Sequence, residues 1–179
     1  MRIKREKTAV VCVDYQEKLL PAVFDGEALI EKSVKLLEGA KALGLPVYLT
    51  QQYTKGLGST IAPICQAAGT EEYVEKLSYS AYPQLKEKLA PPEEMPYVVI
   101  CGIESHVCVL QTAMELKENG YQPYLVTNCI ASRKREDYET ALVRARQEGI
   151  LLTTYEAVLF ELLEVAGTPD SKAVQKIVK

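Results

Sequence analysis

The feature that most constrains the fold is a near-continuous apolar run at residues 8–15 (TAVVCVDY) that contains one carboxylate close to its end. Runs of this kind, without polar alternation, are typical of strands buried on both faces of a parallel sheet. Similar runs recur, and segments with helical spacing separate them. In residues 27–43, for example, Ile30, Val34 and Leu37 lie three or four positions apart before a glycine ends the helix. This alternation predicts a parallel sheet covered by helices on both faces.

The same pattern places the individual elements. We expect strands at residues 8–15, 46–52, 73–78, 97–102, 121–127 and 150–154. We expect helices at residues 27–43, 83–89, 105–119, 136–148, 156–164 and 170–179. The sequence therefore predicts one domain, residues 1–179, with a three-layer α/β/α architecture and a doubly wound, mostly parallel sheet of about six strands.

Composition and charge exclude several classes of function. The net charge is −3, from 21 basic and 24 acidic residues, whereas a nucleic-acid-binding domain usually carries a basic face. No apolar run approaches the ~20 residues needed to cross a bilayer, and the charged segment 2–7 does not resemble a signal peptide. We therefore expect a cytosolic protein that binds neither nucleic acid nor membranes.

Residues typical of metal and cofactor sites are scarce. The five cysteines form no CxxC motif and are interpreted as free thiols, and His106 is the only histidine. This set does not make a transition-metal site. The first strand is not followed by GxGxxG, so dinucleotide binding has no support. We expect no metal and no cofactor.

Candidate functional residues gather where strands end. In an open parallel sheet, ligands bind at the carboxyl ends of the strands. Asp14 lies near the end of the first strand, Gln52 ends the second, and Cys108 follows the strand at residues 97–102. We expect these three positions to meet at one edge of the sheet.

Cys108 lies about one turn into a predicted helix, where free N–H groups and the helix dipole favour a thiolate and can hold an oxyanion. A buried structural cysteine is the alternative. Asp14 is suited to proton transfer or, alternatively, caps the strand end. Lys76 either pairs with Asp14 or is an ordinary surface lysine. Side chains two apart at a helix start do not face each other, so we interpret His106 as a rim or substrate contact rather than as the base for Cys108.

Three separated segments together resemble the isochorismatase-like cysteine hydrolase superfamily. Residues 11–16 (VCVDYQ) resemble its strand ending in D-x-Q, and residues 74–82 (VEKLSYSAY) resemble its K-x-x-x-S-[AM]-[FY] stretch. Residues 101–108 (CGIESHVC) resemble its G-[IV]-x-[TSA]-x-x-C motif. Segments 52–58, 131–133 and 153–156 also resemble the isochorismatase domain-containing branch, so that the resemblance covers residues 8–178.

The resemblance implies a role for each matching residue. Asp14 matches the general base, Lys76 the lysine that orients it, and Cys108 the nucleophile that attacks an amide carbonyl and forms a thioester. The family has a cis peptide bond at the position of Ile103–Glu104, which would turn the Glu104 N–H towards the oxyanion beside the Cys108 N–H. We expect the substrate, a small molecule, to meet Gln16, Gln52, Tyr53, Tyr82 and His106.

Departures from the family pattern narrow the range of substrates and reactions that we expect. Nicotinamidases use a histidine-rich metal site that this chain lacks, which argues against nicotinamide as the substrate. Isochorismatases cleave a vinyl ether without needing the cysteine, so Cys108 favours amide chemistry over that alternative. A catalytically idle binding protein and a thiol-based redox sensor remain as further alternatives. The carboxylate of Glu104 would oppose an oxyanion, so it either points away from that position or selects a cationic or hydrogen-bond-donating substrate.

The late helices bear on assembly. Val158, Leu159, Leu162, Leu163 and Val165 are more apolar than one core-facing stripe requires. Together with the family resemblance, they predict a homo-oligomer. A helix packed fully into the core is the alternative.

Overall fold

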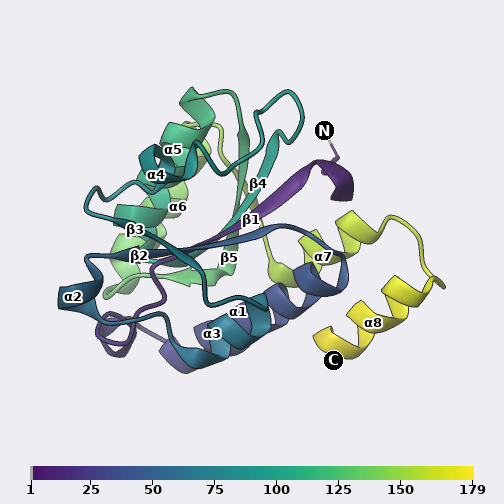
Figure 1. The fold of residues 1–179 in the computed structure, drawn as a ribbon, viewed down its shortest axis with the longest axis horizontal. Helices are drawn as coiled ribbons and strands as arrows, with labels where there is room; N and C mark the ends of the chain where they lie inside the picture. Colours follow the sequence, from purple (N-terminus) through teal and green to yellow (C-terminus); the bar gives the residue numbers. More distant parts are fainter. Residues whose placement is uncertain (1) are drawn as a thin grey trace.

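A computed structural model describes residues 2–179, and its centre is one sheet. Within the described residues, six strands pair in the order β3-β2-β1-β4-β5-β6, and every pairing is parallel. The strands are β1 (Thr8–Val13), β2 (Val47–Gln52), β3 (Tyr73–Lys76), β4 (Tyr97–Ile103), β5 (Gln122–Ala131) and β6 (Leu151–Thr153). The predicted three-layer, doubly wound α/β fold is confirmed (Figure 1).

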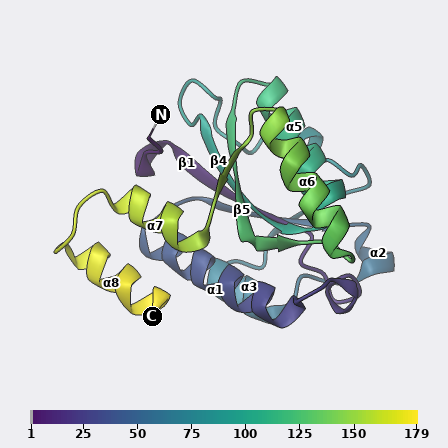
Figure 2. The same ribbon diagram turned by 180° about the vertical axis from the view of Figure 1, so that it is seen from behind.

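Helices cover both faces of the sheet (Figures 1 and 2). One face packs against α1 (Gly26–Ala42), α3 (Ala62–Ala68), α7 (Tyr155–Leu163) and α8 (Pro169–Val178). The other face packs against α4 (Tyr82–Leu85), α5 (Leu110–Glu118) and α6 (Arg135–Gln147). Short elements complete the chain: α2 (Thr54–Leu57), the 3₁₀ turns Arg5–Lys7 and Leu20–Ala22, and a π-helical turn, Ser105–Val109.

Alternation along the strands explains the two-sided core. In β1, Val10 and Cys12 join the cluster beneath α1, whereas Val11 and Val13 join the cluster beneath α5. Successive side chains of a strand point to opposite faces, so a strand covered on both sides has to be apolar at every position. All six residues of β1 are accordingly buried.

Three predicted elements differ most from the structure. The single helix expected at 105–119 is a π-helical turn followed by α5. The strand expected at 121–127 extends to Ala131, because β5 continues past its register shift to pair with the end of β4. The helix expected at 83–89 is only the short α4. Helices α2 and α3 lie in the least regular stretch and were not predicted.

The apolar late helices are mainly core. Val158, Leu159 and Leu162 are almost fully buried against the sheet and α1, which is the alternative to an oligomer interface that the sequence left open. On this hairpin, Phe160 and Val165 stay exposed. Among residues 2–179, none of the helices combines the length and apolar character needed to span a bilayer.

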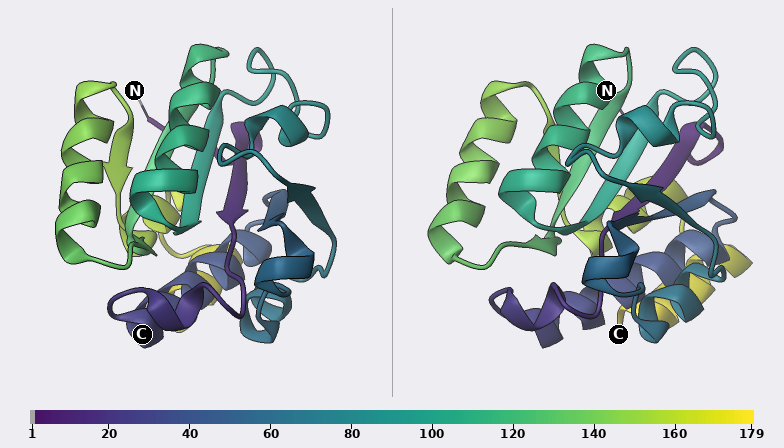
Figure 3. Two further views of the ribbon diagram at one scale, coloured as in Figure 1. Left: turned by 90° about the vertical axis from the view of Figure 1, so that its left-hand side faces the viewer. Right: turned by 60° about the vertical axis from the view of Figure 1, so that its left-hand side comes forward.

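The direction in which the chain crosses the sheet reverses between β1 and β4. The chain winds from β1 outwards through β2 to β3, and from β4 outwards in the other direction through β5 to β6 (Figure 3). At such a reversal the loops after the two central strands separate, which leaves room for a ligand at the carboxyl edge. The loops after β1 and β4 carry Asp14 and Cys108.

Candidate active site

The end of β1 presents Asp14 through an unusual backbone. Asp14 has a φ of 54°, in the left-handed region, and immediately follows Val13. The neighbouring β4 comes very close here, because Gly102 is in register with Val13 and a Cβ at position 102 would lie 2.1 Å from the Val13 carbonyl oxygen. Gly102 also has a φ of 130°, which an L side chain rarely adopts. This glycine therefore sets the spacing between the loops that follow β1 and β4.

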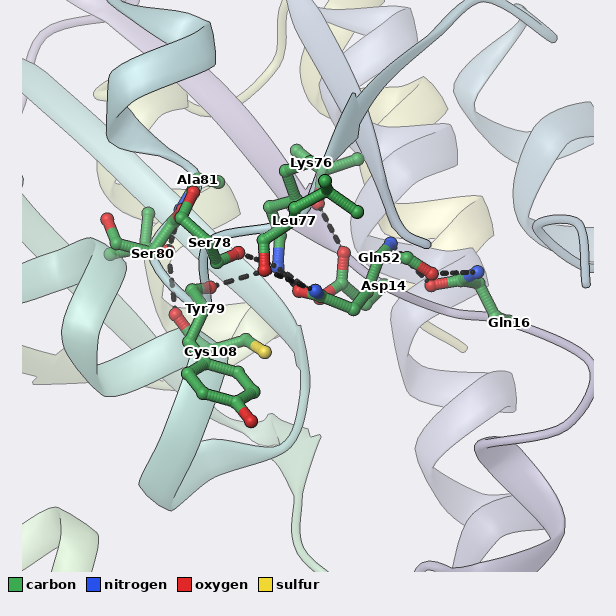
Figure 4. A network of polar contacts seen from close by, with 12 residues as sticks. Asp14, Gln16, Gln52, Lys76, Leu77, Ser78, Tyr79, Ser80, Ala81 and Cys108 are labelled. Carbon is green, nitrogen blue, oxygen red and sulfur yellow. Dashed lines mark hydrogen bonds and ion pairs between the residues drawn. The ribbon is translucent and has the colours of Figure 1, made fainter. Parts of the chain in front are cut away.

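Asp14 and Lys76 form an ion pair with no exposed surface (Figure 4). The Lys76 Nζ lies 2.7 Å from Asp14 Oδ2, although β3, which carries Lys76, is the edge strand two positions away from β1. Thr50 on the intervening β2 donates a hydrogen bond of 2.7 Å to Asp14 Oδ1. Within residues 2–179, Oδ2 receives no well-aligned hydrogen bond in addition to this ionic contact. One carboxylate oxygen is thus fixed, and the other retains accepting capacity.

Oxygen atoms surround the Lys76 ammonium. It donates to Gln52 Oε1 at 2.6 Å, to the Tyr79 carbonyl at 2.9 Å and to the Ser78 carbonyl at 3.3 Å. A buried ammonium is costly unless its protons are paired, and these acceptors together with Asp14 supply the pairing. The loop after β3 therefore wraps around the lysine and holds its charge beside the carboxylate.

Cys108 lies in the π-helical turn that follows β4 and is 8% exposed. Single π turns are often found at functional sites. Burial and the nearby Asp14 carboxylate raise the pKa of the Cys108 thiol to about 12, although Lys76 acts in the opposite direction. The sequence predicted a lowered pKa, and that prediction was wrong because desolvation of the sulfur is the largest effect. In the resting protein the thiol is protonated.

Glu104 sits between β4 and the turn that carries Cys108. The Ile103–Glu104 peptide bond is cis. Glu104 Oε1 accepts hydrogen bonds from the Arg133 backbone N–H at 3.1 Å and from Arg133 Nε at 2.9 Å. The sequence left open a carboxylate that points away from the oxyanion or one that selects a substrate; the structure shows this carboxylate paired with Arg133, an arrangement that the sequence did not indicate.

Two predicted substrate contacts are used inside the protein. Gln16 is fully buried, and its amide nitrogen donates to the carbonyls of Gln52 and Gly58 while its oxygen accepts from the Gln52 N–H. It therefore holds the ends of β1 and β2 together rather than facing a substrate. The Gln52 side chain accepts a hydrogen bond from Lys76 through Oε1 and donates one to the Leu77 carbonyl through Nε2.

The remaining predicted contacts lie around the site at different depths. His106 Nδ1 lies 2.9 Å from Ser132 Oγ, so the ring is anchored towards β5 and α6. Tyr53 follows β2 and is 49% exposed. Tyr82, at the start of α4, packs edge-on against Tyr121 and against the apolar cluster that includes Cys108.

Four residues near the site were missed by the sequence reasoning. Leu77 and Tyr79 project from the loop around Lys76 and are largely exposed, and Thr50 and Thr112 are buried hydrogen-bonding residues. Leu77 and Tyr79 occupy variable positions inside the K-x-x-x-S motif, which was a usable signal for these two. Single threonines inside a strand or helix carry none.

Metal and disulfide chemistry find no support in the described part of the chain. Residues 2–179 contain no group of three or more His, Cys, Asp or Glu side chains placed to hold a metal ion. All five cysteines are free thiols, as the sequence predicted. The site consists of a carboxylate, an ammonium and a thiol from three different elements.

Comparison with known proteins identifies the family. The isochorismatase domain model matches residues 8–157. The chain is 35% identical to mouse isochorismatase domain-containing protein 2A over 178 residues, covering 99% of this chain and 85% of the mouse protein. The chain therefore belongs to the isochorismatase domain family, as its three motifs predicted.

Solved structures agree with this assignment. MAR1 ribonuclease from Caenorhabditis elegans superposes with a TM-score of 0.92 at 31% identity, covering 99% of this chain and 92% of that one. YcaC from Escherichia coli, described as an octameric hydrolase of unknown specificity, has a TM-score of 0.85 at 24% identity, covering 92% of this chain and 83% of that one. The second match supports the fold alone.

Proposed function

We propose that this protein is a cysteine hydrolase that cleaves the C–N bond of a small amide, with Cys108 as nucleophile, Asp14 as base and Lys76 as the positioning cation. The observation that carries the proposal is the fully buried Lys76–Asp14 pair at the carboxyl edge of the sheet, in which Asp14 Oδ2 retains accepting capacity. A structural ion pair is rarely favourable enough to be kept for stability alone.

The proposed reaction begins when a substrate carbonyl reaches this edge of the sheet. Asp14 takes the thiol proton, and the Cys108 sulfur bonds to the carbonyl carbon. The N–H groups of Glu104 and Cys108 are the proposed donors to the oxyanion, since both belong to the segment that carries the nucleophile. Asp14 then passes its proton to the departing nitrogen, the C–N bond breaks, and a thioester remains.

Water completes the proposed cycle. Asp14 accepts a proton from a water molecule, which attacks the thioester carbonyl. The C–S bond then breaks, the leaving sulfur takes the proton back from Asp14 to restore the Cys108 thiol, and a carboxylic acid is released. Lys76 keeps its proton throughout and stabilises the carboxylate form of Asp14. Because Thr50 occupies Oδ1, the proton moves through Oδ2, the oxygen beside the ammonium.

The surroundings suggest the kind of amide. Tyr53 and Tyr79 are exposed aromatic residues on the two segments that contact Lys76. The charge of Glu104 is paired with Arg133, so the site offers no unpaired carboxylate there for a cationic substrate. We propose an uncharged amide with an apolar or planar group, contacted by Tyr53, Tyr79 and the nearby His106.

The test is ammonia or amine release from a panel of small aliphatic and aromatic amides, with Cys108→Ala compared to Cys65→Ala. Cys65 is the partly exposed cysteine of α3 and lies outside the candidate site, which makes its variant a matched control. We expect Cys108→Ala to lose at least about a thousandfold in rate and Cys65→Ala to stay within twofold. Mass spectrometry of the quenched enzyme should show an acyl adduct on the Cys108 peptide.

Other outcomes would point to other activities. Turnover that survives Cys108→Ala would refute the thiol mechanism and favour vinyl-ether hydrolysis, whereas binding without turnover would favour an idle binding protein. RNA should also be tested as a substrate, because the C. elegans relative is named a ribonuclease. Phosphate binding needs free basic residues, but Arg133, Lys134 and Arg135 each pair with a carboxylate.

We also propose that the protein forms a homo-oligomer. The exposed Phe160 and Val165 on the α7–α8 hairpin are apolar and close in sequence, which favours burial against another copy. YcaC, a more distant relative in fold, is described as an octamer. Light scattering coupled to size-exclusion chromatography tests this, and a monomer mass at micromolar concentration would contradict it.

A further inference from the structure

A threonine of α5 links the two parts of the site that share no strand pairing. The Thr112 hydroxyl donates to the Cys108 carbonyl at 2.6 Å and accepts from the Ala81 N–H at 2.9 Å. Thr112 has no exposed surface, and Ala81 is 1% exposed. The hydroxyl thus uses its donor in one direction and an acceptor lone pair in the other, and each bond polarises the next.

The two hydrogen-bond partners of Thr112 lie next to different members of the candidate triad: one in the loop around Lys76 and one on Cys108. Ala81 ends the loop whose Ser78 and Tyr79 carbonyls accept from Lys76 (Figure 4). The Cys108 carbonyl belongs to the nucleophile itself. A short polar path therefore runs from the lysine through its loop and Thr112 to the cysteine.

Side-chain hydrogen bonds from β2 hold the first two triad members. Asp14 and Lys76 are joined directly and are held from β2 by Thr50 and Gln52. The π-helical turn that bears Cys108 follows β4, and β4 is not adjacent to β2 or β3 in the sheet. The pairing of β4 with β1 places the thiol near Asp14, whereas its position relative to the Lys76 loop also depends on contacts between the β3–α4 loop and α5, where Thr112 supplies a polar link.

We propose that Thr112 is a positioning residue, whose hydroxyl ties the Lys76 loop to the Cys108 turn and so holds the thiol beside the Asp14 carboxylate. The inference rests on the proposed function, because it assigns Thr112 a part in the same triad. It also makes a claim about thiol chemistry that needs no substrate.

The experiment measures how strongly Asp14 controls the Cys108 thiol. Asp14 is among the causes that raise the Cys108 pKa, so Asp14→Asn should increase iodoacetamide alkylation of Cys108 at pH 8 by about tenfold or more. If Thr112 positions the thiol, the same Asp14→Asn change in a Thr112→Val background should raise the rate by less than about threefold. Thr112→Ser keeps the hydroxyl and should keep the full gain.

A purely structural role gives a different result. It would lower the denaturation midpoint of Thr112→Val but leave the Asp14→Asn gain unchanged, and that result would overturn the proposal. Thr112→Ala, which removes the hydroxyl without placing a methyl group against the Ala81 N–H, is the second variant with the same expectation. If both fail to fold while Thr112→Ser folds, the hydroxyl is needed for the fold itself and the proposal is again overturned.

Turnover separates this inference from the proposed function. With an amide substrate, Thr112→Val should lower kcat more than tenfold and change KM less than threefold, since the substrate contacts remain. If no amide is turned over by any variant, the proposed function fails. The alkylation comparison still decides whether Thr112 holds the thiol beside Asp14.

Discussion

The raised pKa of Cys108 gives a direct prediction about its reactivity. At a pKa of about 12 instead of the ordinary 9.0, the thiolate fraction at neutral pH falls by about a thousandfold. Because only the thiolate reacts with iodoacetamide, the alkylation rate of Cys108 in the folded protein should keep rising about tenfold per pH unit from pH 7 to beyond pH 10. Steric shielding of the buried sulfur lowers the alkylation rate at every pH by the same factor, so the slope of the rate against pH is unchanged.

The assay maps alkylation at each cysteine by peptide mass, with the same protein unfolded in urea as the reference. In urea, the Cys108 rate should level off near the ordinary pKa, and the ratio of unfolded to folded rates should exceed about a thousand at pH 7. A folded-state rate that levels off with a midpoint below pH 9 would refute the reasoning. It would mean that the Lys76 ammonium offsets the effects of burial and Asp14 on the pKa of the thiol.

Three further predictions follow from packing and charge around the site. Gly102→Ala should lower the free energy of unfolding by about 3 kcal/mol, because the new Cβ meets the β1 backbone and φ is positive; a loss below 1 kcal/mol by urea denaturation would contradict this. Lys76→Met should cost about 3–5 kcal/mol by leaving the Asp14 carboxylate buried and unpaired; the double variant with Asp14→Asn should recover part of that loss, and no recovery would argue against the pairing. Tyr79→Ala should raise KM about five- to tenfold for aromatic amides and leave kcat within threefold. Tyr73 is an exposed tyrosine on β3 outside the Lys76 loop, and Tyr73→Ala should leave both constants unchanged. Equal effects of the two substitutions would show that Tyr79 does not contact the substrate.

The sequence could predict the fold because its signals are local and repeated. Apolar runs without alternation mark strands covered on both faces, and glycines at the ends of helical spacing mark where α1, α5 and α6 stop. Within the least regular region, α2 and α3 were not predicted, because short helices bury too few residues to leave a period.

The candidate residues Asp14 and Cys108 could be found from the strand ends alone, because the carboxyl edge of a parallel sheet is where such loops converge. Lys76 was accessible only through the family motif, since a lysine at the end of a short edge strand looks like a surface residue.

Only the tertiary structure decided what these groups are chemically. The Cys108 thiol is protonated rather than activated because surroundings distant in sequence remove it from water. Gln16 and Gln52 became structural because other strands supply their partners, and Thr50 and Thr112 gained importance in the same way. Periodicity along a chain determines which residues are buried. Burial from all sides and the hydrogen-bond partner of each polar atom depend on the neighbouring elements, and those are fixed only when the chain has folded.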